Sequence, residues 1–143
     1  MDHILAAQPL KVPTMLVASL WDQEDIYGAP ALYKALKATG ANNDKLFLVF
    51  GPWHHGQEIG DGSSLGPIKF NSDTGLYFRQ EILRPFLDKY LKDGNSKDDG
   101  PHAEVAPVTA FETGTNTWRR LPTWPSGCAS GCTIQATPLY LTA

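Results

Sequence analysis

Residues 12–25, VPTMLVASLWDQED, place an apolar segment directly before a cluster of acidic side chains. The first nine of these residues are apolar or small, which is typical of a strand buried on both faces of a sheet. Residues 45–50, KLFLVF, form a second apolar segment of this kind. Between the two, residues 29–39 repeat apolar side chains at helical spacing, with Pro30 near the start and Gly40 just past the end. Strand, helix and strand in this order predict a βαβ unit of a parallel sheet, and so an α/β fold.

The next part of the chain is predicted to be a long polar loop followed by a helix. Residues 57–73 are polar and glycine-rich, and long loops of this kind are often functional. From residue 74 to residue 92, apolar side chains recur at every third or fourth position, which predicts an amphipathic helix. Pro85 lies inside this helix and cannot donate a backbone hydrogen bond, so we expect a kink or a break near residues 83–85.

The last third of the chain has a different pattern. Residues 93–101, DGNSKDDGP, concentrate turn formers and charges and are interpreted as a linker. After this linker, short segments rich in aromatic and β-branched residues are separated by glycine, asparagine and proline. This pattern predicts β-strands at residues 105–111, 118–121 and 138–142.

The composition excludes several classes of protein. The 143 residues include 12 Lys plus Arg and 15 Asp plus Glu, a net charge of −3, which argues against a polybasic nucleic-acid binder. The longest apolar runs are far shorter than the roughly 20 residues that a membrane-spanning helix needs. Residues 1–9 show no basic stretch followed by an apolar core, so no signal peptide is visible. We therefore expect neither nucleic acid nor a membrane as a partner.

Two polar side chains follow the predicted strands. Asp22 comes directly after the first strand, and His55 comes shortly after the second. The carboxyl ends of parallel strands are where catalytic groups collect in open sheets. An acid followed by a histidine is also the chain order of the last two members of a hydrolase triad. Taken alone this spacing is weak evidence, and a structural or solvated role for both residues is the alternative.

Several motifs, in order along the chain, resemble those of the α-amino acid ester hydrolases. These enzymes belong to a wider group of serine hydrolases that includes cocaine esterase and the Xaa-Pro dipeptidyl peptidases. The motifs are LWDQED at 20–25, GPWHH at 51–55, FRQEILRPFLDKYLKDG at 78–94, and TGTNTW with LPTWP between 113 and 125. The resemblance implies that residues 1–99 are the C-terminal portion of an α/β-hydrolase domain with a parallel sheet. It also implies that residues 100–143 begin a β jelly-roll domain.

The resemblance also implies roles for four side chains. Asp22 matches the triad acid and His55 the triad base, whereas His54 occupies a variable position and is interpreted as a surface histidine. Glu24 and Asp25 match two members of a carboxylate cluster that binds the α-ammonium group of the substrate. The alternative for these two acids is that they favour the start of the following helix through its dipole.

The nucleophile is not expected within this chain. Gly62-Ser63-Ser64-Leu65-Gly66 is the one match to G-x-S-x-G. A nucleophile elbow needs an apolar strand before the serine and a helix after it, and neither is predicted around Ser64. This match also follows His55, which reverses the expected order. The resemblance places the true nucleophile upstream of the residues present here, so the chain alone is expected to be inactive.

The implied function is that of a serine hydrolase fragment. The intact enzyme would hydrolyse or transfer α-amino acyl groups of esters and β-lactam antibiotics through an acyl-enzyme, with no metal or organic cofactor. Two alternatives remain open: a cocaine-esterase-like or acylase-like hydrolase without α-amino specificity, and a noncatalytic truncated product. Homo-oligomerisation of the full-length enzyme is also left open.

The two cysteines bear on the compartment. Cys128 and Cys132 are interpreted as a disulfide, because relatives with a similar pair are exported bacterial enzymes and disulfides persist in oxidising compartments. Two free thiols are the alternative. On this basis a periplasmic or secreted location is expected for the full-length enzyme.

Overall fold

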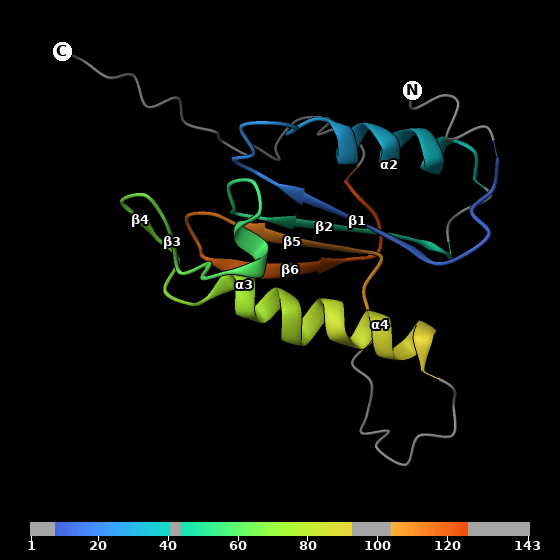
Figure 1. Cartoon of the computed structure of the whole chain (residues 1–143). Helices are drawn as coiled ribbons and strands as arrows, with labels where there is room; N and C mark the ends of the chain where they lie inside the picture. Colours follow the sequence, from blue (N-terminus) through green and yellow to red (C-terminus); the bar gives the residue numbers. More distant parts are fainter. Residues whose placement is uncertain (1–7, 41–43, 93–103, 126–143) are drawn as a thin grey trace.

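The computed structural model describes residues 8–40, 44–92 and 104–125, which contain a four-stranded mixed sheet and helices on both of its faces (Figure 1). Strand β1 (Thr14–Ser19), helix α2 (Gly28–Ala38) and strand β2 (Leu46–Gly51) form the βαβ unit that the sequence predicts. Strands β1 and β2 are parallel and in register from Thr14 opposite Leu46 to Ser19 opposite Gly51. The carboxyl ends of both strands therefore lie side by side at the same end of the sheet.

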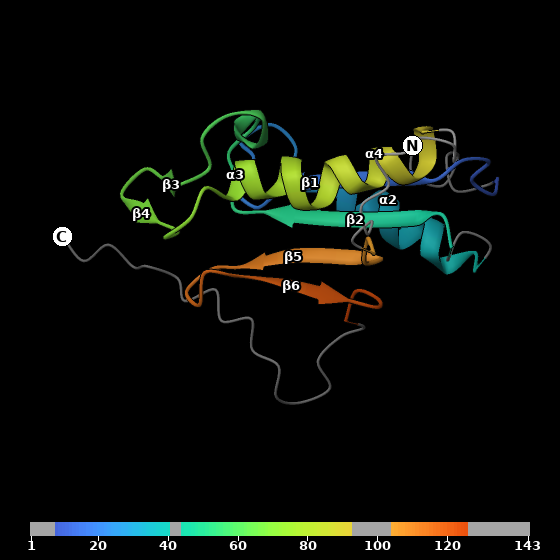
Figure 2. The same ribbon diagram turned by 90° about the horizontal axis from the view of Figure 1, so that it is seen from below.

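Strand β2 lies at the centre of the hydrophobic core, and all six of its residues are buried. Its side chains alternate between the two faces, as the pleat of a strand requires. Leu46, Leu48 and Phe50 pack with α2 on one face. Phe47 and Val49 pack on the other face with the helical region that starts at residue 74. The sheet therefore has helices on both faces, with α2 on one side and α3 and α4 on the other (Figure 2).

The predicted helix from 74 to 92 is continuous but changes its winding. Helix α3 (Thr74–Tyr77) leads into a π-helical segment (Phe78–Leu83), which continues as α4 (Arg84–Leu91). The amide of Arg84 donates to the carbonyl of Arg79, five residues earlier. Pro85 follows this wide turn directly, so the helix accommodates the proline without the break that the sequence led us to expect.

The π-helical segment also explains the spacing of the buried side chains. Phe78, Ile82 and Phe86 are four residues apart, and all three are buried. In an α-helix with 3.6 residues per turn, each step of four overshoots a full turn by about 40°. A π turn is wider than an α turn, so it offsets this drift and keeps the three side chains facing the sheet.

The last two strands join the same sheet as the first two. Strand β5 (Val108–Glu112) pairs in parallel with β2, and β6 (Thr117–Leu121) pairs antiparallel with β5, which gives the order β1-β2-β5-β6. Residues from both predicted parts, 1–99 and 100–143, therefore contribute strands to this sheet, and the predicted boundary itself lies outside the described residues. The start of a jelly roll is not confirmed, and the third predicted strand, at 138–142, lies outside the described residues.

The predicted loop at 57–73 contains short elements of its own. A 3-10 turn (Gln57–Ile59) comes first, followed by a small hairpin of β3 (Ser64–Leu65) and β4 (Ile68–Lys69). Within the described part of the chain, no helix has the length and apolar character needed to cross a bilayer.

Candidate active site

The loops after β1 and β2 are joined beyond the ends of the strands. The amide of Leu20 donates to the carbonyl of Gly51 at 2.9 Å, and the amide of Trp21 donates to the carbonyl of Trp53 at 3.0 Å. These two bonds extend the parallel ladder into the loops. They bring the residues that follow, Asp22 and His55, close together beyond the carboxyl ends of the two strands.

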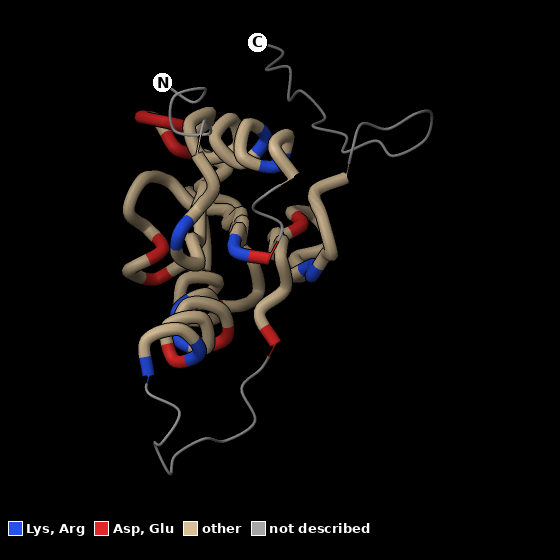
Figure 3. Tube along the Cα trace, turned by 90° about the vertical axis from the view of Figure 1, so that its right-hand side faces the viewer, with Lys and Arg blue, Asp and Glu red and all other residues tan. Residues whose placement is uncertain are grey.

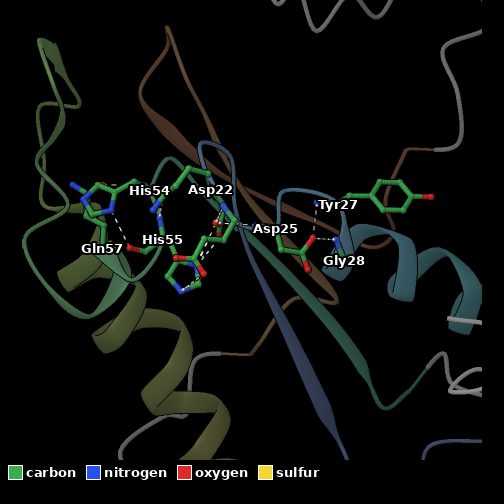
Figure 4. A network of polar contacts seen from close by, with 9 residues as sticks. Asp22, Asp25, Tyr27, Gly28, His54, His55 and Gln57 are labelled. Atoms are coloured by element: carbon green, nitrogen blue, oxygen red, sulfur yellow. Dashed lines mark hydrogen bonds and ion pairs between the residues drawn. The ribbon is translucent and has the colours of Figure 1, made fainter. Parts of the chain in front are cut away.

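Asp22 and His55 form a hydrogen-bonded pair (Figure 4). The imidazole Nδ1 lies 3.1 Å from Oδ2 and 3.2 Å from Oδ1 of the carboxylate. A carboxylate can only accept, so Nδ1–H donates and Nε2 is left to exchange protons with another group. The Asp22 side chain is 12% exposed and that of His55 is 52% exposed. The acid is therefore enclosed, whereas the imidazole is open to an incoming group.

The backbone around Asp22 fixes its carboxylate. Oδ1 accepts hydrogen bonds from the backbone amides of Glu24 at 2.8 Å and Asp25 at 3.1 Å. These two backbone hydrogen bonds, more than the contact with His55, lower the pKa of Asp22 below its ordinary value. The hydrogen bond to Asp22, reinforced by the charges of Glu24 and Asp22, raises the pKa of His55. The pair thus favours an ionised acid and a basic imidazole, as a triad acid and base require.

Glu24 and Asp25 point to different places. A carboxylate oxygen of Glu24 lies 3.8 Å from Nε2 of His55, and the Glu24 side chain is 65% exposed. Oδ1 of Asp25 instead accepts the amides of Tyr27 at 3.1 Å and Gly28 at 2.6 Å, where α2 begins (Figure 4). Glu24 is therefore the acid next to Nε2 of His55, and Asp25 supports the start of the helix.

Gln57, which the sequence did not single out, holds residues on both sides of His55. Its Oε1 accepts the amide of His54 at 3.2 Å, and its Nε2 donates to the carbonyls of Asp61 at 3.0 Å and Ser64 at 2.7 Å. The imidazole of His54 donates to the carbonyl of His55 at 2.9 Å and lies on the side away from Asp22 (Figure 4). No motif signals Gln57, because its partners are backbone groups.

Ser64 does not lie at a strand-to-helix turn. It belongs to β3 and pairs with Lys69 across the small hairpin. Among the described residues, no hydrogen bond joins its hydroxyl to His55. The local geometry agrees with the expectation that Ser64 is not the nucleophile.

The described residues hold no metal-binding cluster and do not include the cysteine pair. Over residues 8–40, 44–92 and 104–125, no group of three or more His, Cys, Asp and Glu side chains could hold a metal ion. Cys128 and Cys132 lie outside the described residues, so the expected disulfide remains a prediction.

Comparison with known proteins gives one family and two solved structures. Residues 2–57 match the family model of the X-Pro dipeptidyl-peptidases (S15 family). An α-amino acid ester hydrolase labelled with selenomethionine is 46% identical, with a TM-score of 0.80 over 92% of this chain and 20% of that chain. An aminopeptidase from the marine sediment archaeon Thaumarchaeota archaeon is also 46% identical, with a TM-score of 0.76 over 87% of this chain and 19% of that one. The chain spans about a fifth of the length of both structures. No curated protein matches it.

Proposed function

We propose that this chain, which is a relative of the S15-family ester hydrolases, supplies the acid and the base of a serine-hydrolase triad. The observation that carries the proposal is the hydrogen bond between Asp22 and His55 at the ends of two parallel strands. A serine outside this chain would attack the acyl carbonyl of the substrate. His55 Nε2 would accept the serine proton and pass it to the leaving alcohol, while Asp22 stabilises the imidazolium. Water would then release the acyl group, again with His55 as base.

We propose an α-amino acyl group as the preferred acyl group. The ammonium group of such a substrate is one carbon away from the reacting carbonyl, so its binding site must be close to Nε2 of His55. Glu24 has this position and is open to solvent. A charge-assisted hydrogen bond from the ammonium to Glu24 would favour α-amino esters over plain esters. Because Asp25 already binds the start of α2, we assign Glu24 the larger share of this selectivity. β-Lactams with an α-amino acyl side chain are proposed as further substrates.

A second candidate is the hydrolysis of amides with a free α-amino group. One of the two similar structures is described as an aminopeptidase, at the same 46% identity as the ester hydrolase. The same acid, base and ammonium contact would serve either leaving group. Comparing an amino acid methyl ester with the matching amino acid amide distinguishes the two candidates.

The test of the triad assignment is complementation. We expect the 143-residue chain alone not to hydrolyse an α-amino acid methyl ester. Adding the upstream segment of a complete relative, with its G-x-S-x-G motif, should restore activity, and His55→Ala should abolish that activity. Activity of the chain alone that is lost in His55→Ala would contradict the proposal, because the nucleophile would then lie in this chain and Ser64 would be the candidate.

The test of ammonium binding uses the matching positions of a complete relative. Replacing the residue that matches Glu24 by Gln should raise KM for α-amino esters roughly tenfold or more, since a charge-assisted hydrogen bond contributes about 1.5 kcal/mol or more. The change that matches Asp25→Asn keeps the acceptor oxygen for α2 and should have a smaller effect. Des-amino esters serve as the control. An equal rise in KM for both ester classes would defeat the ammonium assignment.

A further inference from the structure

We infer that Arg79 is a positioning residue for His55, acting through the loop that follows the histidine. The inference rests on the proposed role of His55 as base, and it concerns how the fold holds this base against Asp22. Arg79 lies in the π-helical segment (Phe78–Leu83), far from His55 in the sequence.

Arg79 binds backbone carbonyls of the loop. Its Nη1 donates to the carbonyl of Glu58 at 2.8 Å and to that of Gly60 at 2.8 Å. These carbonyls come three and five residues after His55. Among the described residues, no carboxylate forms an ion pair with Arg79, so its charge is directed at these two oxygens. Hydrogen bonds from a charged donor are stronger than neutral ones, and one guanidinium nitrogen can serve both acceptors.

The helix that carries Arg79 packs directly on the same loop. A Cβ on Gly75 would lie 2.7 Å from the carbonyl oxygen of Gly60 and 3.3 Å from that of Glu58. Only glycine allows the helix and the loop to approach this closely. The gap that Gly75 leaves open is the one that the Arg79 side chain spans.

Further bonds from the helix start secure both ends of the segment around His55. The Thr74 hydroxyl accepts a hydrogen bond from Nε1 of Trp53 at 2.8 Å and donates one to the carbonyl of Gly62 at 2.7 Å. Oδ1 of Asp73 accepts the amide of Gly62 at 2.9 Å. Trp53 is fully buried and comes two residues before His55. His55 is thus the exposed part of a segment whose two ends are anchored to one helix.

The turn immediately after the histidine is closed by Gln57, whose backbone amide donates to the carbonyl of His54, and Arg79 holds the residues that come next. Gly56 has a φ of 78°, so the chain reverses direction directly after His55. Such a turn allows the histidine to swing unless the residues that follow are held. Arg79 holds the carbonyls of Glu58 and Gly60, which come two and four residues after Gly56. Without these bonds we expect the His55 imidazole to leave Asp22 for part of the time.

The experiment is a pair of measurements on the full 143-residue chain that need no hydrolysis. NMR titration gives the pKa of His55, which the carboxylates of Asp22, Glu24 and Glu58 raise. Hydrogen exchange of the amides of residues 57–62 reports the opening of the loop. Arg79→Met should lower the pKa of His55 toward its ordinary value of 6.5 and speed exchange about tenfold. Arg79→Lys, which keeps a charged donor, should restore part of both effects.

Arg84→Met is the matched control, because Arg84 lies on the same helix but contacts Asp88, 3.6 Å away, and is 75% exposed. It should change neither measurement. A folded Arg79→Met chain with the pKa of His55 and the loop exchange of the wild type would overturn the inference.

Gly75→Ala decides the case if Arg79→Met does not fold. This change pushes the helix away from Gly60 and should produce the same two effects in weaker form, so unchanged values would again overturn the inference. Since neither measurement depends on ester hydrolysis, failure of the proposed function and failure of this inference are distinguishable.

Discussion

At the scale of single residues, the state of His55 depends on how Asp22 is satisfied. The carboxylate accepts two backbone amides from its own loop and the imidazole Nδ1–H. Because the backbone amides remain in place whatever the charge of His55, the acid stays ionised and keeps its orientation. The imidazole is the partner whose pKa is raised, and in the proposed mechanism the nucleophile would supply the proton on its Nε2.

Asp22→Asn should lower the pKa of His55 toward 6.5, because an amide neither attracts the imidazolium nor accepts from it as strongly. The raised pKa also means that the pair stabilises the folded chain fully below pH 6.5 and loses this contribution as the pH rises through the folded pKa of His55. The lowered pKa of Asp22 adds a contribution that is present above pH 3.8 and is lost as the pH falls through its folded value.

NMR titration of His55 and urea unfolding at several pH values test this prediction. Asp22→Asn should remove the part of the pH dependence of stability that lies between pH 6.5 and the folded pKa of His55. His55→Ala identifies the histidine signal and should remove the same part. If the pKa of His55 is unchanged in Asp22→Asn, the hydrogen bond between the two side chains does not form in solution.

At the scale of secondary-structure elements, the start of α3 is fixed by Asp73. Its carboxylate accepts the amide of Leu76 at 2.9 Å as the N-cap and also the amide of Gly62 at 2.9 Å. Asp73→Ala should therefore lower the free energy of unfolding by about 1 kcal/mol, a common loss for a removed N-cap. Asp73→Asn keeps the acceptor and is the control. Urea denaturation followed by circular dichroism measures both, and equal stability of the alanine variant and the wild type would contradict the capping role.

The same scale shows which elements can be predicted from the sequence. The βαβ unit was predicted nearly to its ends, because long apolar runs and helix end signals are local properties. The π-helical segment was not predicted, since the effect of Pro85 depends on which side chains must face the sheet. The hairpin of β5 and β6 was predicted as strands, but its short segments carry no information about which sheet they join. Only the parallel pairing of β5 with β2, from Leu48 opposite Val108 to Phe50 opposite Ala110, shows which sheet the hairpin joins.

The candidate site also contains some residues that the sequence could identify and others that it could not. Asp22 and His55 could be singled out because they follow buried strands within a few residues and parallel strands bring their carboxyl ends together, while their expected roles came from the resemblance. Glu24 lies next to His55, whereas Asp25 contacts the start of α2, and the role of both acids in binding an ammonium group stays a prediction. Gln57 and Arg79 could not be found. Their partners are backbone carbonyls and amides, which are present at every position and leave no pattern in the sequence.

At the scale of the whole molecule, the described sheet has an open edge at β1. Strand β1 is the first strand in the order and pairs with β2 on one side only. The amides of Thr14 and Leu20 donate toward the β2 side, so the amides of alternate residues, Met15, Val17 and Ser19, point away from it. Neither β1 nor β2 carries a charged residue, and charges lie on other parts of the chain (Figure 3). Val12, two residues before β1, and Trp21, two residues after it, are large exposed apolar side chains.

An uncharged strand edge with apolar neighbours pairs readily with another chain, so we expect the isolated 143-residue chain to self-associate through β1. Val17 is 36% exposed and lies in the middle of the strand. Val17→Lys should shift the chain toward the monomer, because two lysines would meet when two copies pair at this edge. Val12→Lys adds the same charge at a more exposed position outside β1 and should weaken association less, because Val12 does not lie in the strand that pairs.

Light scattering over a range of protein concentrations measures the mass of each variant. A wild-type chain that stays monomeric at every concentration would contradict the expected association. Equal effects of the two lysines would show that net charge, and not pairing at β1, controls it. Both similar structures are about five times as long as this chain. If the upstream segment used for complementation pairs with the open side of β1, it should suppress association of the wild type. That result would link the recovery of activity to the pairing of the upstream segment with β1. Val17→Lys should then weaken both this pairing and the recovery of activity.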